Sequence, residues 1–220
     1  MPEQSGTESS LLASRLVGSC QSGRSDYIHK LSSDPSEAYQ AASKLIDEAE
    51  KSRDCRDAVI NDLIQSLNEA DLRNDQAAFL LWARGSGILG KLKAVEALDL
   101  LIDHLDLDDG LFSASMIHQP VVPAVQSMGE VAIPKLSFAV KYHPKRDIRL
   151  AAAFCLVDID GPQARRELIS ALDSETDQCV RRFITLSLPT PTNTSNSNRR
   201  LTARDGDVLM QRLLAFKCAN

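Results

Sequence analysis

Aromatic residues are scarce in this chain of 220 residues, where Phe, Trp and Tyr together account for 5% and Trp occurs once. A β-sandwich relies on aromatic and β-branched residues, so this composition disfavours one. Long apolar runs are also missing: runs such as residues 77–83 are far below the roughly 20 residues of a membrane helix. These absences exclude a transmembrane segment and favour helices that pack through small side chains.

Cysteine motifs and a signal sequence are lacking as well. The five cysteines are odd in number, widely spaced and free of a C-x-x-C pair, which argues against a disulfide framework or a zinc site. Cys155 and Cys179 are therefore expected to be small, buried apolar residues. The first eight residues are acidic where a signal peptide would be positively charged, so we expect a cytoplasmic protein.

Motifs for catalysis are absent or incomplete. The four histidines lie in separate segments, H-E-x-x-H and G-x-S-x-G do not occur, and no nucleophile can be paired with a base. Residues 85–90 do spell G-x-G-x-x-G, but a dinucleotide site needs a preceding strand and a parallel sheet, and alternating strand patterns are missing. We interpret these glycines as small residues at a close helix crossing, and we expect no cofactor.

What the chain does have is helical periodicity. Hydrophobic residues make up 43% of it, which is ample for a core, and they recur at i, i+3, i+4 and i+7. Asp34 and Pro35 form a helix-start signal ahead of the first clear stripe. The pattern predicts helices around residues 38–49, 60–67, 76–89, 94–105, 120–128, 132–142, 148–159, 164–172 and 178–188.

The helices are arranged in pairs, and the pairs recur. An Arg-bearing apolar helix, a Gly-containing turn, a second apolar helix and an acidic loop follow one another over residues 146–182. Residues 75–188 resemble HEAT repeats, in particular the short kind also found in phycobilin lyases. The resemblance is carried by Leu89-Gly90, Met128-Gly129, the turn Asp158-Ile159-Asp160-Gly161 and the segment Asp177-Gln178-Cys179-Val180-Arg181.

This resemblance implies an all-α fold, a right-handed α-solenoid of stacked antiparallel helix pairs. We expect residues 1–33 to cap a HEAT-like domain over residues 34–188, and residues 189–204 to be a flexible linker before a C-terminal helix over residues 205–220.

The concave surface of such a stack is a recognition platform, so we expect a non-catalytic scaffold or adaptor that binds another protein. An accessory enzyme resembling phycobilin lyases and a nucleic-acid-binding HEAT-like protein are the alternatives. The net charge of −5 counts against nucleic acid.

Charge is distributed unevenly along the chain. Residues 1–140 hold 12 Lys and Arg against 21 Asp and Glu, a net −9, whereas residues 141–220 hold 13 against 9, a net +4. Asp106, Asp108 and Asp109 lie at an acidic repeat boundary and form our candidate docking patch for a basic partner. We expect no metal there, because an EF-hand loop would place Leu105 and Leu107 at ligand positions.

Three arginines near the starts of predicted helices resemble ligand contacts: Arg149, Arg181 and Arg182. In a helical repeat, a cation at this position more often bridges an acidic residue of the neighbouring loop. We therefore expect these arginines to have a structural role.

Overall fold

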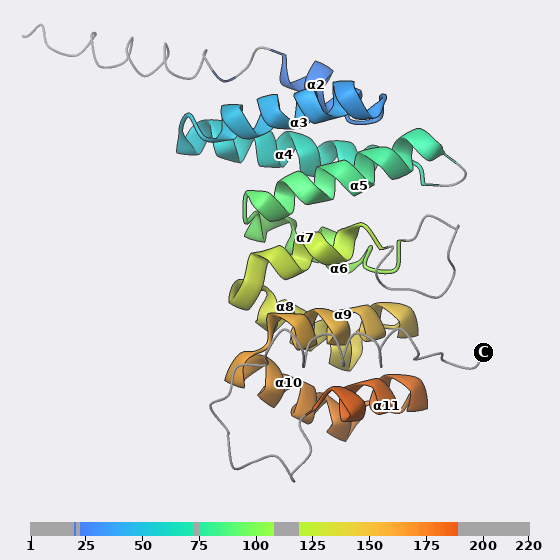
Figure 1. Ribbon diagram of the computed structural model, residues 1–220. Helices are drawn as coiled ribbons and strands as arrows, with labels where there is room; N and C mark the ends of the chain where they lie inside the picture. The colour runs from blue at the N-terminus through green and yellow to red at the C-terminus, as the bar shows by residue number, and fades with distance from the viewer. Residues whose placement is uncertain (1–19, 21–22, 73–74, 108–118, 189–220) are drawn as a thin grey trace, which may run out of the picture. The chain divides into compact units, whose positions relative to one another are not determined.

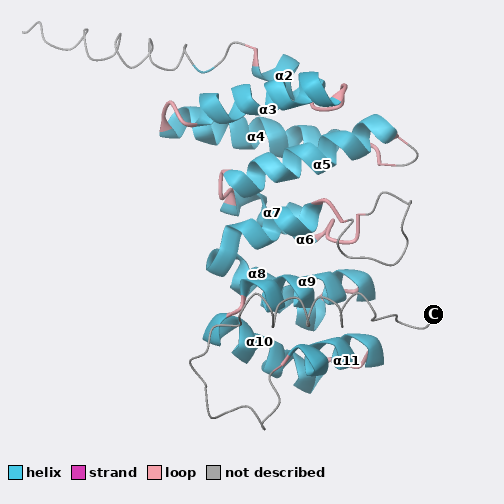
Figure 2. Ribbon diagram, in the orientation of Figure 1, coloured by secondary structure: helices cyan, strands magenta, loops and turns pink. Residues whose placement is uncertain are grey.

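The computed structural model describes residues 20, 23–72, 75–107 and 119–188, and every regular element within these ranges is helical (Figures 1 and 2). The all-α prediction is therefore confirmed for the described part of the chain. None of its helices is long and apolar enough to cross a membrane. The expected linker, the expected C-terminal helix and most of the expected capping segment lie outside the described residues.

Two compact units divide the chain, Met1–Ala97 and Leu98–Asn220. The first contains α2 (Arg24–Lys30), α3 (Pro35–Ala49), α4 (Arg53–Glu69), α5 (Gln76–Lys91) and the short 3-10 helix η2 (Val95–Ala97). Each of the four α-helices packs on the next in sequence, and α2 also contacts α4 while α3 contacts α5. The helices of this unit thus alternate between two rows.

Side-chain caps explain where α3 and α5 of the first unit begin. The Asp34 carboxylate accepts hydrogen bonds from the backbone N–H groups of Ser36 and Glu37, which confirms the predicted start of α3. The Asp75 carboxylate accepts from the N–H of Ala77 in the same way at α5. These bonds satisfy donors that have no partner within the first helical turn.

The second unit repeats this alternation with more helices. Those on one side contact one another in the order α6, α8, α10, and those on the other in the order α7, α9, α11. Their bounds are α6 (Leu98–Ile102), α7 (Val121–Met128), the 3-10 helix η4 (Gly129–Ala132), α8 (Ile133–Tyr142), α9 (Arg146–Ile159), α10 (Gly161–Ser174) and α11 (Gln178–Ser187).

Small side chains let α9 sit at the centre of the second unit, where it contacts α7, α8, α10 and α11. Ala151, Ala152 and Ala153 are fully buried, and the ring of Phe154 packs near that of Phe183 on α11. Alanine has little side-chain volume, so neighbouring helices approach on several sides of α9.

The cysteines do not behave as their spacing predicts. Cys20 and Cys55 form a disulfide with their Cα atoms 5.3 Å apart, and Cys179 is also disulfide-bonded. The expectation of no disulfides is therefore wrong, because the fold brings together residues that are 35 positions apart in sequence. Cys155 is free and buried, as expected, whereas Cys179 is only partly buried.

Candidate functional site

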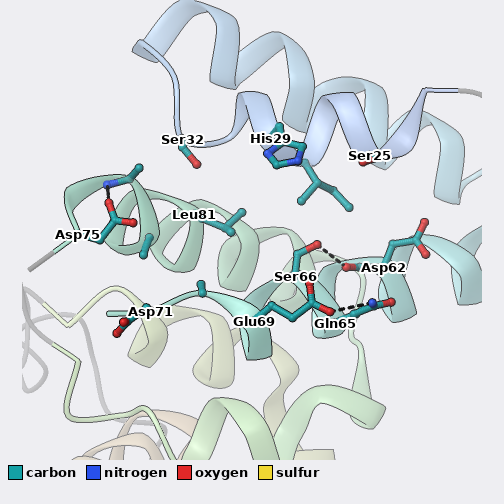
Figure 3. Close-up of a pocket in the computed structure, with 14 residues that line it drawn as sticks. Ser25, His29, Ser32, Asp62, Gln65, Ser66, Glu69, Asp71, Asp75 and Leu81 are labelled. Atoms are coloured by element: carbon teal, nitrogen blue, oxygen red, sulfur yellow. Dashed lines mark hydrogen bonds between the residues drawn. The ribbon is translucent and has the colours of Figure 1, made fainter. Parts of the chain in front are cut away.

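A pocket of about 560 Å³ opens in the first unit, where α2, α4 and α5 meet (Figure 3). Figure 3 shows Ser25, His29 and Ser32 on the α2 side of this pocket, facing the side chains of α4 and the start of α5. The complete lining consists of Ser25, Ile28, His29, Ser32, Asp62, Gln65, Ser66, Glu69, Ala70, Asp71, Asp75, Ala77, Ala78 and Leu81.

Helix α4 contributes a polar stripe to this pocket. Four of its residues line the pocket at the spacing i, i+3, i+4, i+7, which places side chains on one face of a helix: Asp62, Gln65, Ser66 and Glu69. The apolar residues Val59, Leu63 and Leu67 of α4 are instead fully buried. One face of α4 therefore anchors the helix in the core, and the other presents hydrogen-bonding groups.

The charge of the pocket is predominantly negative. Its lining contains the carboxylates of Asp62, Glu69, Asp71 and Asp75, one imidazole, and neither Lys nor Arg. Arg24 offsets one of these charges, because its Nε donates to the Asp62 carboxylate at 2.7 Å.

Two of the other carboxylates have neutral hydrogen-bond donors as partners. Glu69 accepts a hydrogen bond from the neutral amide of Gln65 at 2.8 Å, and Asp75 accepts one from a backbone N–H. Glu69, Asp71 and Asp75 are all exposed. The pocket is therefore suited to a cationic group.

The polar side chains that line the pocket form few hydrogen bonds with one another in the described structure. In the described structure, the imidazole of His29 makes no hydrogen bond to a hydroxyl or carboxyl group of the lining, so no nucleophile and base are paired there. The Ser66 hydroxyl donates to the backbone carbonyl of Asp62, within its own helix. What the pocket offers is a set of acceptors for a positively charged ligand.

The residues that line the pocket are not among the candidate site residues predicted from the sequence. The signals that point to them are the polar stripe of α4 and the density of carboxylates in the polar break at residues 68–75. By itself, this polar break indicates only a loop between two helices. The contribution of α2 becomes visible only once α2 has been placed against α4 and α5.

Of the predicted docking patch, only Asp106 lies within the described residues; Asp108 and Asp109 lie outside them. Asp106 accepts a hydrogen bond from Lys145 at 3.1 Å. The neighbouring carboxylates Asp99 and Asp103 are similarly placed next to Lys135 and His143. The described part of this acidic stretch thus faces basic residues of the same unit.

Arg149 and Arg181 make structural contacts of the kind expected for them. Arg149 bridges to Glu175, with its Nε 2.8 Å from a carboxylate oxygen, as the repeat pattern predicts. Arg181 donates instead to the backbone carbonyls of Leu172 and Glu175. Arg182 is exposed on α11.

The G-x-G-x-x-G motif lies inside α5, not in a turn between a strand and a helix. A Cβ atom at Gly85 would lie 3.3 Å from Cδ2 of Leu67 on α4, so Gly85 allows the close crossing of these helices. Gly87 faces open space. The described geometry agrees with helix packing and gives the motif no phosphate-binding loop.

Comparisons with known proteins add no further evidence on function, since no protein-family model, curated protein or solved structure matches this chain.

Proposed function

We propose that this chain is a non-catalytic scaffold that binds another protein, and that its acidic pocket receives a Lys or Arg side chain of that partner. The observation that carries the proposal is the pocket lining, which holds four carboxylates and neither Lys nor Arg. A primary ammonium or guanidinium group matches such a lining in charge and in hydrogen-bond donors.

The helix arrangement supports the scaffold part of the proposal. Within each unit, the helices alternate between two rows and contact their neighbours in the same row. This alternation is typical of helical repeats, which commonly recognise other macromolecules. We therefore also propose that the fold is a HEAT-like, right-handed α-solenoid. As a separate proposal, the protein acts in the cytoplasm.

The test is a binding measurement with a defined basic probe. A fluorescently labelled peptide rich in Lys and Arg is titrated with the full chain, and its anisotropy is followed at low and at physiological salt. Glu69→Lys and Asp71→Lys should each weaken binding roughly tenfold or more, because they place a cation beside the ligand cation.

A matched control comes from the same unit. Asp47 is an exposed carboxylate on α3 outside the pocket lining, so Asp47→Lys makes the same charge change elsewhere. Equal losses in Glu69→Lys and Asp47→Lys would reject the pocket as the binding site. A partner recovered from the native host should be captured by wild type and by Asp47→Lys, and lost with Glu69→Lys.

Two results would support a different function. Salt-dependent binding of duplex DNA that exceeds binding of the basic peptide would support the nucleic-acid alternative. Turnover of a small molecule by the purified chain, or bilin absorbance acquired on expression, would support the accessory-enzyme alternative.

A further inference from the structure

A second group of side chains in the first unit has a chemistry different from that of the pocket. The Sγ atoms of Cys20 and Cys55 and a carboxylate oxygen of Glu48 lie within 4.8 Å of one another. The two cysteines are 7% and 2% exposed, and the Glu48 side chain is 14% exposed. Two sulfur atoms and one carboxylate are thus held together in a largely dry environment.

Three separate elements hold this cluster in place. Cys20 precedes α2, Glu48 lies in the last turn of α3, and Cys55 lies in the first turn of α4. The backbone N–H of Cys55 donates to the capping hydroxyl of Ser52 at 3.2 Å.

The disulfide between these cysteines depends on the redox conditions around the protein. In a reducing cytoplasm, such cysteines are kept as free thiols. The reduced protein then has two thiols and a carboxylate next to one another, and the Cα atoms of the two cysteines are 5.3 Å apart. Lys51, which pairs with Glu48, is 56% exposed and can turn into solvent.

We propose that the reduced form binds a thiophilic divalent cation, with Zn²⁺ as the best match, through Cys20, Cys55 and Glu48. In tetrahedral zinc sites the metal lies about 2.3 Å from sulfur and about 2.0 to 2.2 Å from carboxylate oxygen, so ligand atoms are roughly 3.5 to 3.8 Å apart. Once the disulfide is reduced, rotation of the three side chains allows their sulfur and oxygen atoms to adopt this spacing. Three protein ligands leave the fourth position to water. Calcium and magnesium prefer oxygen ligands and do not match the sulfur pair.

A small dithiol reductant supplies two electrons and two protons to the disulfide, opening the S–S bond to two thiols, and itself becomes a cyclic disulfide. The metal ion then displaces one proton from each thiol and binds the two thiolates and the Glu48 carboxylate. The disulfide and the metal site are mutually exclusive, because both use the same sulfur atoms.

The experiment uses the full chain and Co²⁺ as a spectroscopic substitute for Zn²⁺. The protein is reduced with a dithiol, the reductant is removed without oxygen, and Co²⁺ is added in steps. We expect thiolate-to-cobalt charge-transfer absorption together with the visible bands of tetrahedral Co²⁺, saturating at one equivalent. Addition of Zn²⁺ should abolish both signals, and the oxidised protein should show neither.

Variants identify the ligands. Cys20→Ser and Cys55→Ser should each lose the thiolate signal, whereas Cys155→Ala, which removes the free cysteine of the second unit, should retain it. Glu48→Gln should weaken binding by at least about tenfold, and Glu50→Gln, an exposed neighbour two residues away, should not.

Circular dichroism on each reduced sample shows whether its helices are intact. Reduced wild type that is helical but gives no cobalt signal would overturn the proposal, as would an unchanged signal in Cys20→Ser or Cys55→Ser. Equal affinity of Glu48→Gln and Glu50→Gln would overturn the three-ligand site.

Discussion

Arginine side chains connect helices in both units by the same means. Each of four guanidinium groups donates to backbone carbonyls at the end of another helix, where the last carbonyls have no partner within the helix itself. A cation there is also favoured by the helix dipole. The donors and acceptors are Arg84 to Leu31 and Ser33, Arg56 to Leu92 and Lys93, Arg149 to His143 and Pro144, and Arg181 to Leu172 and Glu175.

Arg149→Ala is expected to destabilise the second unit by about 3 kcal/mol or more, because it leaves the Glu175 carboxylate buried without its counterion. The side chain of Glu175 is 2% exposed, and that of Arg149 is 15% exposed. Urea unfolding followed by circular dichroism measures the loss. Arg146→Ala is the control, since Arg146 pairs with Asp147 at the surface, and it should change stability by less than about 1 kcal/mol. Equal effects of the two substitutions would contradict the structural role of Arg149.

The carboxylate of Glu167 on α10 accepts hydrogen bonds from two side chains of α8. The Ser137 hydroxyl and the Lys141 ammonium group donate to its carboxylate and hold the pKa of Glu167 below its ordinary value of 4.5. Because the folded pKa is lowered, the carboxylate stabilises the fold above the ordinary value, and this contribution is lost as pH falls through the lowered pKa.

Glu167→Gln should therefore lower the melting temperature at pH 7, and its difference from wild type should shrink as the pH falls below 4.5. Thermal melts across this range test the expectation. Glu130→Gln, at an exposed position of η4, should follow the wild-type curve throughout. A constant difference between wild type and Glu167→Gln at every pH would show that ionisation of Glu167 is not responsible.

At the scale of the element, local patterns predict most helices well and miss one. The stripe at residues 148–159 and the turn at Gly161 correspond to α9 and α10. Helix α2 is missed because Ile28 is its single buried residue, so it has no apolar stripe to recognise. The start of α4 is also missed: the predicted stripe begins at residue 60, while the Ser52 cap starts the helix at Arg53.

Two neighbouring positions on α10 test which face of this helix is buried. Leu168 is 2% exposed and Ile169 is 54% exposed, so the same substitution meets opposite environments. Leu168→Asp should destabilise by several kcal/mol, because its carboxylate would be buried without a partner, and Ala152→Asp on α9 should do the same. Ile169→Asp should change the circular dichroism melt only slightly. A melt of Leu168→Asp that matches Ile169→Asp would mean that the face assigned to the core is wrong.

At the scale of the whole molecule, the charge asymmetry of the sequence does not follow the division into units. Residues 1–97 hold 11 Lys and Arg against 15 Asp and Glu, a net −4, and residues 98–220 hold 14 against 15, a net −1. Within the second unit, carboxylates at residues 99–106 face basic groups at residues 135–145. Of these pairs, Asp106 with Lys145 joins the acidic part of the sequence to the basic part.

The predicted docking patch can be tested by measuring the rate of association with a basic peptide. Asp106→Lys, Asp108→Lys and Asp109→Lys combined should slow association with a basic peptide and leave the melting temperature nearly unchanged. The Asp106–Lys145 pair is partly exposed, so its loss should change stability by about 1 kcal/mol at most. Stopped-flow measurements at two salt concentrations give the association rate, and equal rates for wild type and variant would remove the steering role.

The sequence by itself determined the helical class and the approximate positions of the longer helices, because periodicity and caps such as Asp34 act over a few residues. It also indicated the packing role of Gly85 in α5, since a motif without a neighbouring strand has no use as a phosphate loop.

Only the tertiary structure decided which distant residues meet. The acidic pocket needs α2 against α4 and α5, and the cluster of Cys20, Glu48 and Cys55 needs three elements to converge. Neither follows from spacing along the chain, because helix packing sets distances between residues that are tens of positions apart. The pairing of Asp106 with Lys145 is of the same kind: local charge is readable from sequence, and its neutralisation by a distant cation is not.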